Sequence, residues 1–556
     1  MPHPDTLIAG EPRFADQPLA DILRQDGPAA AWHHALQQLG PARAAAAATN
    51  GFAVGLTGVN GSTFLAVDRF AIHSLCYRLV DGRLHFAERA DQLGDGDLDP
   101  QAIFDYLYFH CIPSPRTIFR NVFRLPPGHY ALYENGQLTV APYWVPEFTE
   151  PRGPVSFDAL KAEFRTLLRE AVATQLDGST AACFLSGGTD SSTVAGMVRE
   201  ATGKPAATYS IGFEAEGYDE MAFARIAAKH FGTEHHEYYV TPADLVRSIA
   251  DVAGSYDQPF GNSSALPAYY CALSARQDGV TRMLAGDGGD ELFGGNSRYA
   301  KQRVFGWYAH VPASLRRSLV QPLFELPATS RVPLLKKGSS YVEQAKVPMP
   351  DRLQMYNLLL RLGTADVLEP RFLARVDLGS PAAQQREVWA LARAGDELNR
   401  TLAYDWRYTL AESDLPKVNG SARLAGMQVR YPMLDDRLLD FSLGLPAAYK
   451  LKGLKLRWFF KEALRGFLPD EIITKKKQGF GLPFGVWLTR HAPLMALAQD
   501  SLASLSGRGI VRPAFIRQLV DQRLQEHPGY YGEMIWILMM LEQWLQRHAP
   551  GYRLTD

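Results

Sequence analysis

The chain has 556 residues, of which 46% are hydrophobic and 21% are charged. That length is more than one hydrophobic core usually organises, so we expect a globular protein of two or more domains. Its 58 basic and 59 acidic residues give a formal net charge of −1, which excludes a general electrostatic attraction to nucleic acid or to anionic membranes.

The amino-terminal segment shows no targeting signal. Residues 1–14 have no basic stretch followed by an apolar one, and no apolar run in the chain approaches the roughly 18 residues that a membrane span needs. We therefore expect a cytoplasmic protein. Its four cysteines lack CxxC or metal-like spacing, which favours reduced, buried thiols over disulfides or a zinc site. They are Cys76, Cys111, Cys183 and Cys271.

Strand patterns dominate the first part of the chain. Short alternating segments at 63–70 and 85–90 predict strands, and residues 129–144 predict a hairpin that turns at Asn135 and Gly136. This part is therefore expected to be rich in β-sheet.

A proline-rich stretch over residues 142–157 predicts a linker between two domains. We expect the first domain at 1–148 and the second at 155–556.

Strands and helices alternate after the linker. The patterns predict a helix over 157–176, a strand over 180–185, a helix over 192–203, a strand over 205–213, a helix over 218–232, and strands over 234–240 and 281–286. Such alternation is typical of a parallel α/β sheet. The remainder of the chain is expected to be mostly helical.

A glycine- and serine-rich loop, SGGTDSS at residues 186–192, follows the first strand of this sheet. Backbone N–H groups at the carboxyl end of a parallel strand, together with the dipole of the next helix, favour an anion. Gly187 and Gly188 allow the backbone to approach a phosphate closely. Hydroxyl donors come from Ser186, Ser191 and Ser192. Taken alone, the pattern is equally compatible with a serine–glycine turn that caps a helix.

The chemistry expected of this loop depends on a lysine and an aspartate. No lysine follows the glycines, so the loop differs from the one that grips a transferred γ-phosphate, and holding pyrophosphate is the better interpretation. Asp190 fits an anion site if its carboxylate holds Mg²⁺ beside the phosphates.

A second loop, GDGGDE at residues 286–291, repeats the arrangement after the strand at 281–286. It supplies the carboxylates Asp287, Asp290 and Glu291. Two such loops on neighbouring strands can place Asp190 and Asp290 across one magnesium pyrophosphate. The alternative is a solvated acidic turn.

Five segments together resemble, in order and spacing, the signatures of the asparagine synthetase family. They are FLSGGTDSS (184–192), YSIGF (209–213), LAGDGGDELFGG (284–295), VRYPMLDDRLLDFSLGLP (429–446) and KKKQGFGLPFGVWL (475–488). The resemblance implies an α/β protein whose second domain is a nucleotide α-hydrolase (PP-loop) domain with a parallel sheet and helical additions.

The first domain also resembles this family, through the back part of its glutaminase domain. The matching segments are 68–77, 109–130 and Tyr143-Trp144. They imply a degenerate, β-rich domain of the Ntn-hydrolase (glutaminase) type.

The resemblance implies that the chain binds ATP and Mg²⁺. Residues 186–192 match the loop that binds the ATP phosphates, Leu185 lies near the nucleotide, and the backbone around Ile211 faces adenine. Ala285 and Gly286 match positions that lie against AMP.

Catalytic positions are implied in the same way. Asp190 and Asp290 match the magnesium-binding aspartates, and Lys477 matches a lysine that stabilises charge on the α-phosphate and pyrophosphate. Asp287 stands where the family has a glutamate or, in β-lactam-forming relatives, a tyrosine, and a carboxylate there could accept a proton from the nitrogen nucleophile. The implied chemistry is attack of a small-molecule or peptide carboxylate on the α-phosphate, release of pyrophosphate, and attack of ammonia or an amine on the acyl-adenylate.

Two departures from the family pattern bear on the nitrogen source and the base. The family's glutaminase uses a cysteine at residue 2, where this chain has Pro2, so we expect no glutamine hydrolysis. Gln428 stands where the family usually has a glutamate. In amine-using relatives that glutamate acts with the residue matching Asp287 to deprotonate the nucleophile, and a neutral amide cannot act as such a base. Either Asp287 acts alone, or the nucleophile arrives neutral, or catalysis is weakened.

Several functions stay open at this stage. The leading one is an AMP-forming amide ligase without glutaminase activity, either ammonia-dependent in making asparagine or, as we favour, acting on a specialised metabolite or peptide like the β-lactam synthetases and lasso-peptide cyclases. A nucleotide-binding scaffold derived from a ligase is the alternative from another class; Gln428 favours it and the intact phosphate motifs oppose it. The tRNA-modifying enzymes that share the SGGxDS loop fit poorly, because the chain has no basic or zinc-binding appendage.

Overall fold

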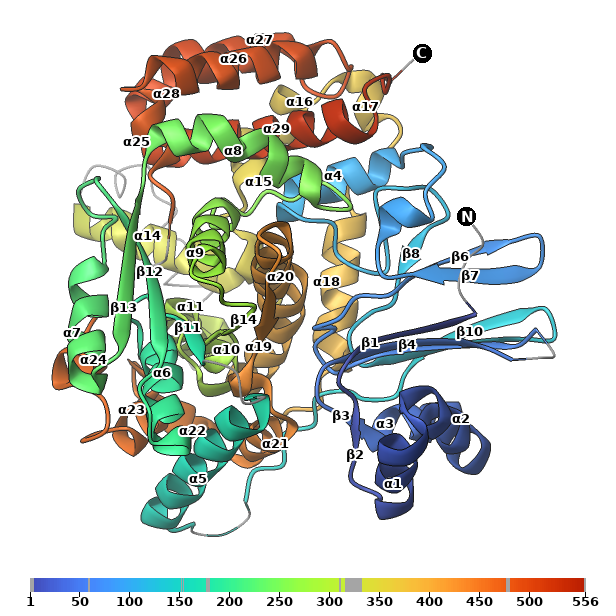
Figure 1. The fold of residues 1–556 in the computed structure, drawn as a ribbon. Coiled ribbons are helices and arrows are strands. Elements are labelled where there is room, and N and C mark those ends of the chain that lie inside the picture. Colours follow the sequence, from blue (N-terminus) through green and yellow to red (C-terminus); the bar gives the residue numbers. More distant parts are fainter. Residues whose placement is uncertain are drawn as a thin grey trace.

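The computed structural model describes residues 5–58, 61–151, 153, 155–176, 181–309, 312–315, 333–476 and 481–554. Two five-stranded sheets organise it, an antiparallel one near the amino terminus and a parallel one further along the chain (Figure 1). The chain is therefore a mixed α/β protein, as the sequence predicted.

The antiparallel sheet has the strand order β1-β4-β5-β9-β10. Its strands are β1 (Thr6–Gly10), β4 (Phe52–Thr57), β5 (Thr63–Val67), β9 (His129–Glu134) and β10 (Gln137–Pro142). The predicted hairpin is confirmed, because β9 and β10 pair directly around Asn135 and Gly136, both at positive φ. A smaller sheet of order β7-β6-β8 is formed by β6 (Cys76–Val80), β7 (Arg83–Ala87) and β8 (Phe123–Arg124).

Side chains alternate between the two faces of the antiparallel sheet, so a hydrophobic layer forms on each face. On β5, Phe64 and Ala66 face one side, toward Trp32, while Leu65 and Val67 face the other, toward the smaller sheet. Three helices carry the first layer: α1 (Gln17–Asp26), α2 (Pro28–Leu39) and α3 (Pro41–Ala47). The sequence patterns predicted neither these helices nor β1.

The parallel sheet has the order β13-β12-β11-β14-β15. Its strands are β11 (Ala182–Phe184), β12 (Ala207–Phe213), β13 (Glu234–Val240), β14 (Arg282–Leu284) and β15 (Gln428–Arg430). The first four were predicted, together with the helices α5 (Phe157–Gln175), α6 (Thr189–Thr202) and α7 (Met221–Phe231). The fifth strand was not predicted, since it joins the sheet from more than a hundred residues further along the chain.

Helices cover both faces of this sheet. Cys183 and Leu284 pack with α5, α6 and α7, whereas the adjacent Ala182 and Met283 pack on the opposite face with α9 (Ala265–Gln277) and α20 (Leu415–Leu424). Ligands bind such sheets at the carboxyl ends of the strands, in the loops that lead into the helices.

A third group of helices packs around α29, near the carboxyl terminus. It contains α8 (Pro242–Ser255), α25 (Phe484–Leu488), α26 (Ala492–Ser506), α27 (Pro513–Gln518), α28 (Leu524–Glu526) and α29 (Pro528–His548). Helix α4 (Pro100–Phe109), from the amino-terminal part, packs into this group, and the Tyr106 hydroxyl donates to the Ile537 carbonyl at 2.8 Å. None of the helices that the structure describes is long and apolar enough to cross a membrane.

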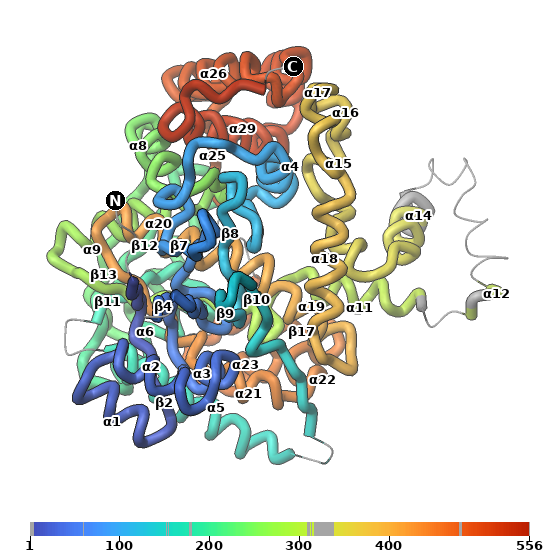
Figure 2. The backbone as a smooth tube through the Cα atoms, turned by 90° about the vertical axis from the view of Figure 1, so that its right-hand side faces the viewer, coloured from blue at the N-terminus to red at the C-terminus, as the bar shows by residue number. Residues whose placement is uncertain are grey.

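Other helices extend along one side of the molecule. These include α11 (Ser297–Ala309), α14 (Pro333–Lys346), α18 (Ser380–Leu391) and α19 (Glu397–Asp405). In Figure 2, α11 and α14 project away from the main body. Helix α19 continues into a π-helical segment, η5 (Trp406–Asp414), which leads directly into α20.

Candidate active site

A cavity of about 1120 Å³ opens at the carboxyl ends of β11, β12 and β14. Nine of the residues predicted from sequence line it: Leu185, Ser186, Gly188, Asp190, Ser191, Ile211, Gly286, Asp287 and Asp290. Three others, Gly187, Ser192 and Ala285, belong to the same loops and are not part of the lining. Lys477 lies outside the described residues, so the structure says nothing of its position. The two loops therefore meet in one cavity, as their order along the chain indicated.

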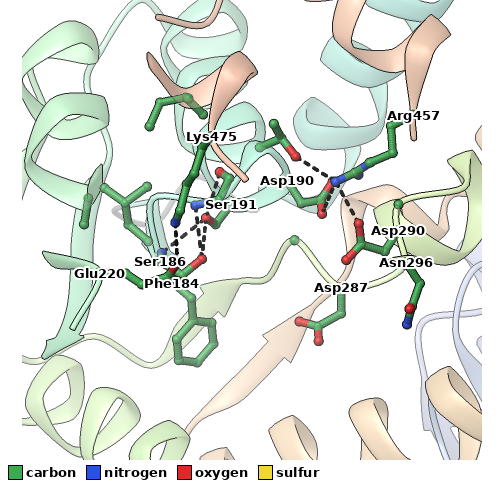
Figure 3. A pocket seen from close by; sticks show the side chains of 18 of the residues that line it. Phe184, Ser186, Asp190, Ser191, Glu220, Asp287, Asp290, Asn296, Arg457 and Lys475 are labelled. Carbon is green, nitrogen blue, oxygen red and sulfur yellow. Dashed lines mark hydrogen bonds and ion pairs between the residues drawn. The ribbon is translucent and has the colours of Figure 1, made fainter. Parts of the chain in front are cut away.

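Hydrogen bonds between its own serines fix the shape of the first loop (Figure 3). The Ser186 N–H donates to Ser191 Oγ at 3.2 Å, and the two hydroxyls lie 3.1 Å apart. Helix α6 begins within the loop, at Thr189, with Gly188 as its N-cap residue, and no side chain caps it. Hydroxyls and uncapped N–H groups at a helix N-terminus are an arrangement suited to an anion.

Gly187 is required by packing against α7. Its φ is +69°, and a Cβ there would lie 2.4 Å from the backbone nitrogen of Ala224 on α7. A Cβ on Gly188 would instead meet a side-chain atom, Ser186 Oγ at 3.3 Å, which can shift slightly. The sequence interpretation gave both glycines one role, and the structure separates them.

Glycines also bring the second loop against the first. A Cβ on Gly286 would lie 2.7 Å from the Ser191 nitrogen, and one on Gly289 would lie 2.2 Å from a carboxylate oxygen of Asp190. The aspartates of the two loops can approach each other because neither glycine carries a side chain.

Asp190 and Asp290 converge on a single guanidinium, that of Arg457 (Figure 3). Arg457 Nη1 lies 2.9 Å from Asp190 Oδ2 and 2.9 Å from Asp290 Oδ1, and Nη2 also pairs with Asp190. The guanidinium is nearly buried and lies over the ring of Phe460, 4.3 Å from its centroid. The two carboxylates thus share one cation, and oxygen ligands of this kind are also those that Mg²⁺ prefers.

Asp287 belongs to a second group of charges. Lys417 Nζ, at the start of α20, lies 3.8 Å from Asp287 Oδ1 and 2.8 Å from Asp414 Oδ1, at the end of η5. Burial raises the pKa of Asp287 to about 6, and the Lys417 ammonium limits that rise. Burial raises the pKa of neighbouring Glu291 to about 8.

A basic rim borders the cavity on the side of α23 (Trp458–Ala463) and α24 (Asp470–Thr474). It contains Lys455, Lys461, Arg465, Lys475 and Lys476. Lys475 Nζ pairs with Glu220 at 2.7 Å and lies 3.5 Å from the Gly187 carbonyl of the first loop. Positive charge from Lys475 therefore reaches the backbone of the first loop.

Residue 428, whose counterpart in amine-using relatives was expected to act with the position of Asp287, lies away from Asp287 in this structure. Gln428 is exposed at the beginning of β15, where it pairs in register with Arg282 and accepts a hydrogen bond from that side chain at 3.3 Å. Asp287 follows the other end of β14, so the length of the strand separates the two residues. Asp414 and Lys417 occupy the surroundings of Asp287 instead.

Sequence reasoning missed Arg457, Asp414 and Lys417. Arg457 lies between a short hairpin and α23, as the N-cap residue of that helix, in a segment with no recognisable motif, and it comes to the site only through the fold. Asp414 ends a π-helical segment and Lys417 follows it; such segments are frequent at functional sites but have no sequence signature of their own.

The comparison with known families agrees with this geometry. The family model described as asparagine synthase matches residues 163–546. The chain belongs to the asparagine synthase family. A second model, described as a glutamine amidotransferase domain, matches residues 30–144.

Relatives in this family are distant but cover most of the chain. An asparagine synthetase [glutamine-hydrolyzing] of Bacillus subtilis is 25% identical over 86% of this chain and 74% of its own length. Another from the same organism is 24% identical over 66% of this chain and 55% of its own length. An amidase of Penicillium rubens is 24% identical over 78% of this chain and 70% of its own length. Members of the asparagine synthase family are ATP-dependent ligases, so the predicted family and enzyme class are confirmed at that level.

All four cysteines of the chain are buried free thiols. Burial raises the pKa of each thiol, to about 12 for Cys183 and further for Cys76, Cys111 and Cys271. A nucleophilic cysteine needs the opposite environment, partly exposed and with a lowered pKa.

Proposed function

We propose that this chain is an AMP-forming amide ligase that activates a carboxylic acid as an acyl-adenylate and transfers it to ammonia or an amine. The observation that carries the proposal is the convergence of two glycine loops, from the adjacent strands β11 and β14, on one cavity that contains serine hydroxyls and two paired aspartates. That arrangement matches the needs of a magnesium nucleotide: donors for phosphate oxygens and carboxylates for the cation.

In this proposal the first loop binds the ATP phosphates, and the backbone around Ile211 on β12 accepts the adenine. Asp190 and Asp290 would hold Mg²⁺, which would supply positive charge against the pyrophosphate. Both are carboxylates that line the cavity, the oxygen ligands that Mg²⁺ prefers, and Mg²⁺ there would neutralise charge that Arg457 neutralises in this structure. Lys477 is proposed to add positive charge beside the α-phosphate.

The reaction has two steps. A carboxylate oxygen of the acid attacks the α-phosphorus, and the bond to the bridging oxygen breaks, which releases pyrophosphate. The nitrogen nucleophile then attacks the acyl carbon, its proton passes to the Asp287 carboxylate, and AMP leaves with the electron pair of the broken C–O bond. Asp287 suits the role of base because it lines the cavity and is partly ionised near neutral pH.

We further propose that the nitrogen comes from ammonia or an amine rather than from glutamine. The four cysteines of the chain lie in environments that disfavour the thiolate, as described above. On the inner face of the antiparallel sheet, Gly55 has the ring of Phe86 2.5 Å from the place of its missing Cβ, so side chains fill the space between the two sheets.

The test is a screen of carboxylic acids for acid-dependent exchange of labelled pyrophosphate into ATP, followed by product analysis with ammonia. We expect AMP and pyrophosphate with the correct acid, and no glutamate from glutamine. Formation of ADP and phosphate would refute the ligase mechanism. Tight ATP binding without exchange for any acid would instead favour the nucleotide-binding scaffold.

If L-aspartate alone supports exchange, and ammonia then gives asparagine, the chain is an ammonia-dependent asparagine synthetase. Exchange with a larger acid would favour a role in modifying a specialised metabolite or peptide.

A further inference from the structure

The carboxylate of Asp287 has a dedicated cationic neighbour. Lys417 Nζ is 3.8 Å from Asp287 Oδ1, and Lys417 is in turn tied to Asp414 at 2.8 Å. These side chains come from three separate elements: the loop after β14, the start of α20 and the end of η5. The contact therefore depends on the fold rather than on neighbours in sequence.

Other charged groups around Asp287 oppose its ionisation. Asp190, from α6, and Asp414 both repel a negative charge at Asp287, and Tyr431, beyond β15, interacts with it electrostatically. Glu291, on α10 (Gly289–Phe293), faces Lys417. Lys417 is the group whose charge favours the carboxylate form.

A general base must be ionised before it can accept a proton, yet burial favours the neutral carboxyl group. A cation 3.8 Å away offsets that cost, and its own position is fixed by the ion pair with Asp414. Lys417 cannot itself be the base in this arrangement, because its own pKa is raised and it stays protonated, although burial alone would lower that pKa.

We propose that Lys417, anchored by Asp414, is a positioning residue that keeps the Asp287 carboxylate ionised and turned toward the nitrogen nucleophile. This inference rests on the proposed function, since it assigns a task in the second step. When the nucleophile loses its proton to an Asp287 oxygen, the N–H electron pair stays on nitrogen, and Lys417 keeps all its protons. The first step, attack of the acid on ATP, does not use Asp287.

The first experiment measures the protonation of Asp287 without turnover. Infrared difference spectra recorded during a pH titration show a carboxyl C=O band for each acid that becomes protonated, and the band absent from Asp287→Asn belongs to Asp287. We expect its midpoint near pH 6 in the unmodified protein, in line with the pKa of about 6. In Lys417→Met the midpoint should rise by about one unit or more, because a neighbouring opposite charge typically shifts a pKa by that amount. An unchanged midpoint would overturn the inference.

The second experiment measures the two steps separately, with ammonia and with hydroxylamine as nucleophile probes and the acid found by pyrophosphate exchange. In Lys417→Met we expect the rate of pyrophosphate exchange to change by less than about threefold, while the rate of amide formation at pH 7 falls by about 10–100-fold. The acidic limb of the pH–rate profile for amide formation should move to higher pH. Lys417→Arg should return the acidic limb of that profile to its original pH, since arginine keeps the positive charge. Equal losses in exchange and amide formation would overturn the proposed role.

Two further comparisons keep the outcomes distinct. Lys417→Gln carries the same test if Lys417→Met does not fold, and Lys229→Met, an exposed lysine on α7, should leave both steps unchanged. If Lys417→Met shifts the midpoint of Asp287 but the protein supports pyrophosphate exchange with none of the acids screened, the proposed function is refuted. The pairing of Lys417 with Asp287 would still stand.

Discussion

At the residue scale, Asp190 and Asp290 carry the strongest prediction. Each is paired with Arg457 in the structure, and in the proposed mechanism each holds Mg²⁺ on pyrophosphate. Changing either to Asn removes one negative charge from a nearly isosteric side chain. We expect pyrophosphate exchange to fall by at least about 100-fold, equivalent to roughly 3 kcal/mol of lost charge stabilisation.

The control for this prediction is Glu237→Gln, on β13. Glu237 forms an ion pair with Arg225 and does not line the cavity, so exchange should stay near normal. Retained exchange in Asp190→Asn or Asp290→Asn, with circular dichroism showing an intact fold in all three variants, would refute the shared metal site.

At the element scale, the turn between β11 and α6 depends on Gly187. An alanine there would have to adopt φ near +69° and would place its Cβ 2.4 Å from the Ala224 nitrogen. The left-handed conformation costs about 1–2 kcal/mol, and overpacking adds about 1–3 kcal/mol. We expect Gly187→Ala to lower the free energy of unfolding by both contributions and to weaken ATP binding, as measured by chemical denaturation and calorimetry.

Gly203, at the other end of α6, provides the matched control. Its φ of +72° is nearly the same, but no atom lies within 4 Å of the position of a Cβ. Gly203→Ala should therefore show only the conformational cost, with ATP binding unchanged. Equal destabilisation by the two substitutions would contradict the packing role assigned to Gly187.

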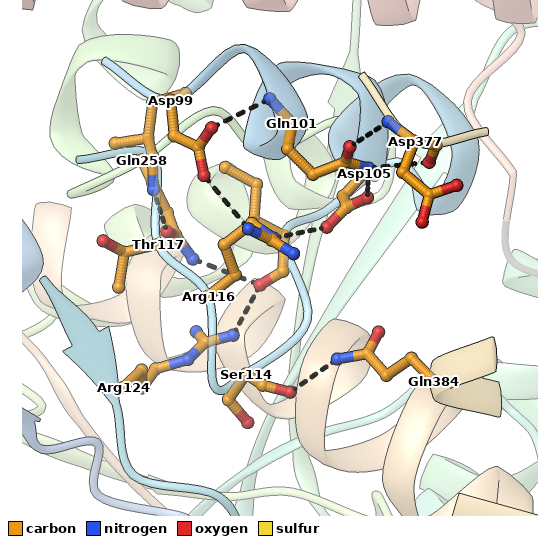
Figure 4. Close-up of polar contacts among 12 residues, drawn as sticks. Asp99, Gln101, Asp105, Ser114, Arg116, Thr117, Arg124, Gln258, Asp377 and Gln384 are labelled. Carbon is orange, nitrogen blue, oxygen red and sulfur yellow. Dashed lines mark hydrogen bonds and ion pairs between the residues drawn. The ribbon is translucent and has the colours of Figure 1, made fainter. Parts of the chain in front are cut away.

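At the scale of the whole molecule, a buried ion network joins the amino-terminal part to the parallel-sheet part. Glu412, on η5, is almost fully buried and accepts hydrogen bonds from the Ser114 N–H at 3.1 Å and the Ser114 hydroxyl at 2.6 Å. Arg124 and Arg407 both pair with it. Figure 4 shows Ser114 and Arg124 at this junction, where Gln384 also donates to the Ser114 carbonyl.

This network predicts that the two parts of the chain depend on each other for stability. Burial alone would raise the pKa of Glu412, but the two guanidiniums hold it below its usual range, so the charged network persists at neutral pH. Glu412→Ala leaves two buried cations without their partner and should cost about 3–5 kcal/mol of unfolding free energy. It should also reduce amide formation, because η5 carries Asp414.

Glu147→Ala is the comparison, since the Glu147–Arg393 pair also joins the two parts but is more than half exposed on both sides. We expect Glu147→Ala to lower the free energy of unfolding by at most about 1 kcal/mol, as is usual for a surface ion pair. A similar effect of both substitutions in a denaturation experiment would contradict the role of the buried network. Because the stabilisation by Glu412 comes from a lowered pKa, it should disappear only as the pH falls below the usual carboxylate range.

Local sequence patterns were enough to locate several helices and strands. Apolar periodicity located α5, α6 and α7, and Asn135-Gly136 located the hairpin of β9 and β10, because backbone preference and side-chain spacing act over a few residues. The two glycine loops could be predicted to meet, since the carboxyl ends of adjacent parallel strands lie at one edge of a sheet. The order of five segments was enough to indicate the family.

The side chains that surround those loops are known from the tertiary structure alone. Arg457 reaches Asp190 from 267 residues away, and Lys417 reaches Asp287 from the far end of a π-helical segment. Conversely, Gln428 was given a catalytic neighbour by sequence comparison, yet β15 places it at the opposite end of the sheet. Long-range contacts of this kind are set by how strands and helices pack, and the free energy of packing is non-local, so no short stretch of sequence records it.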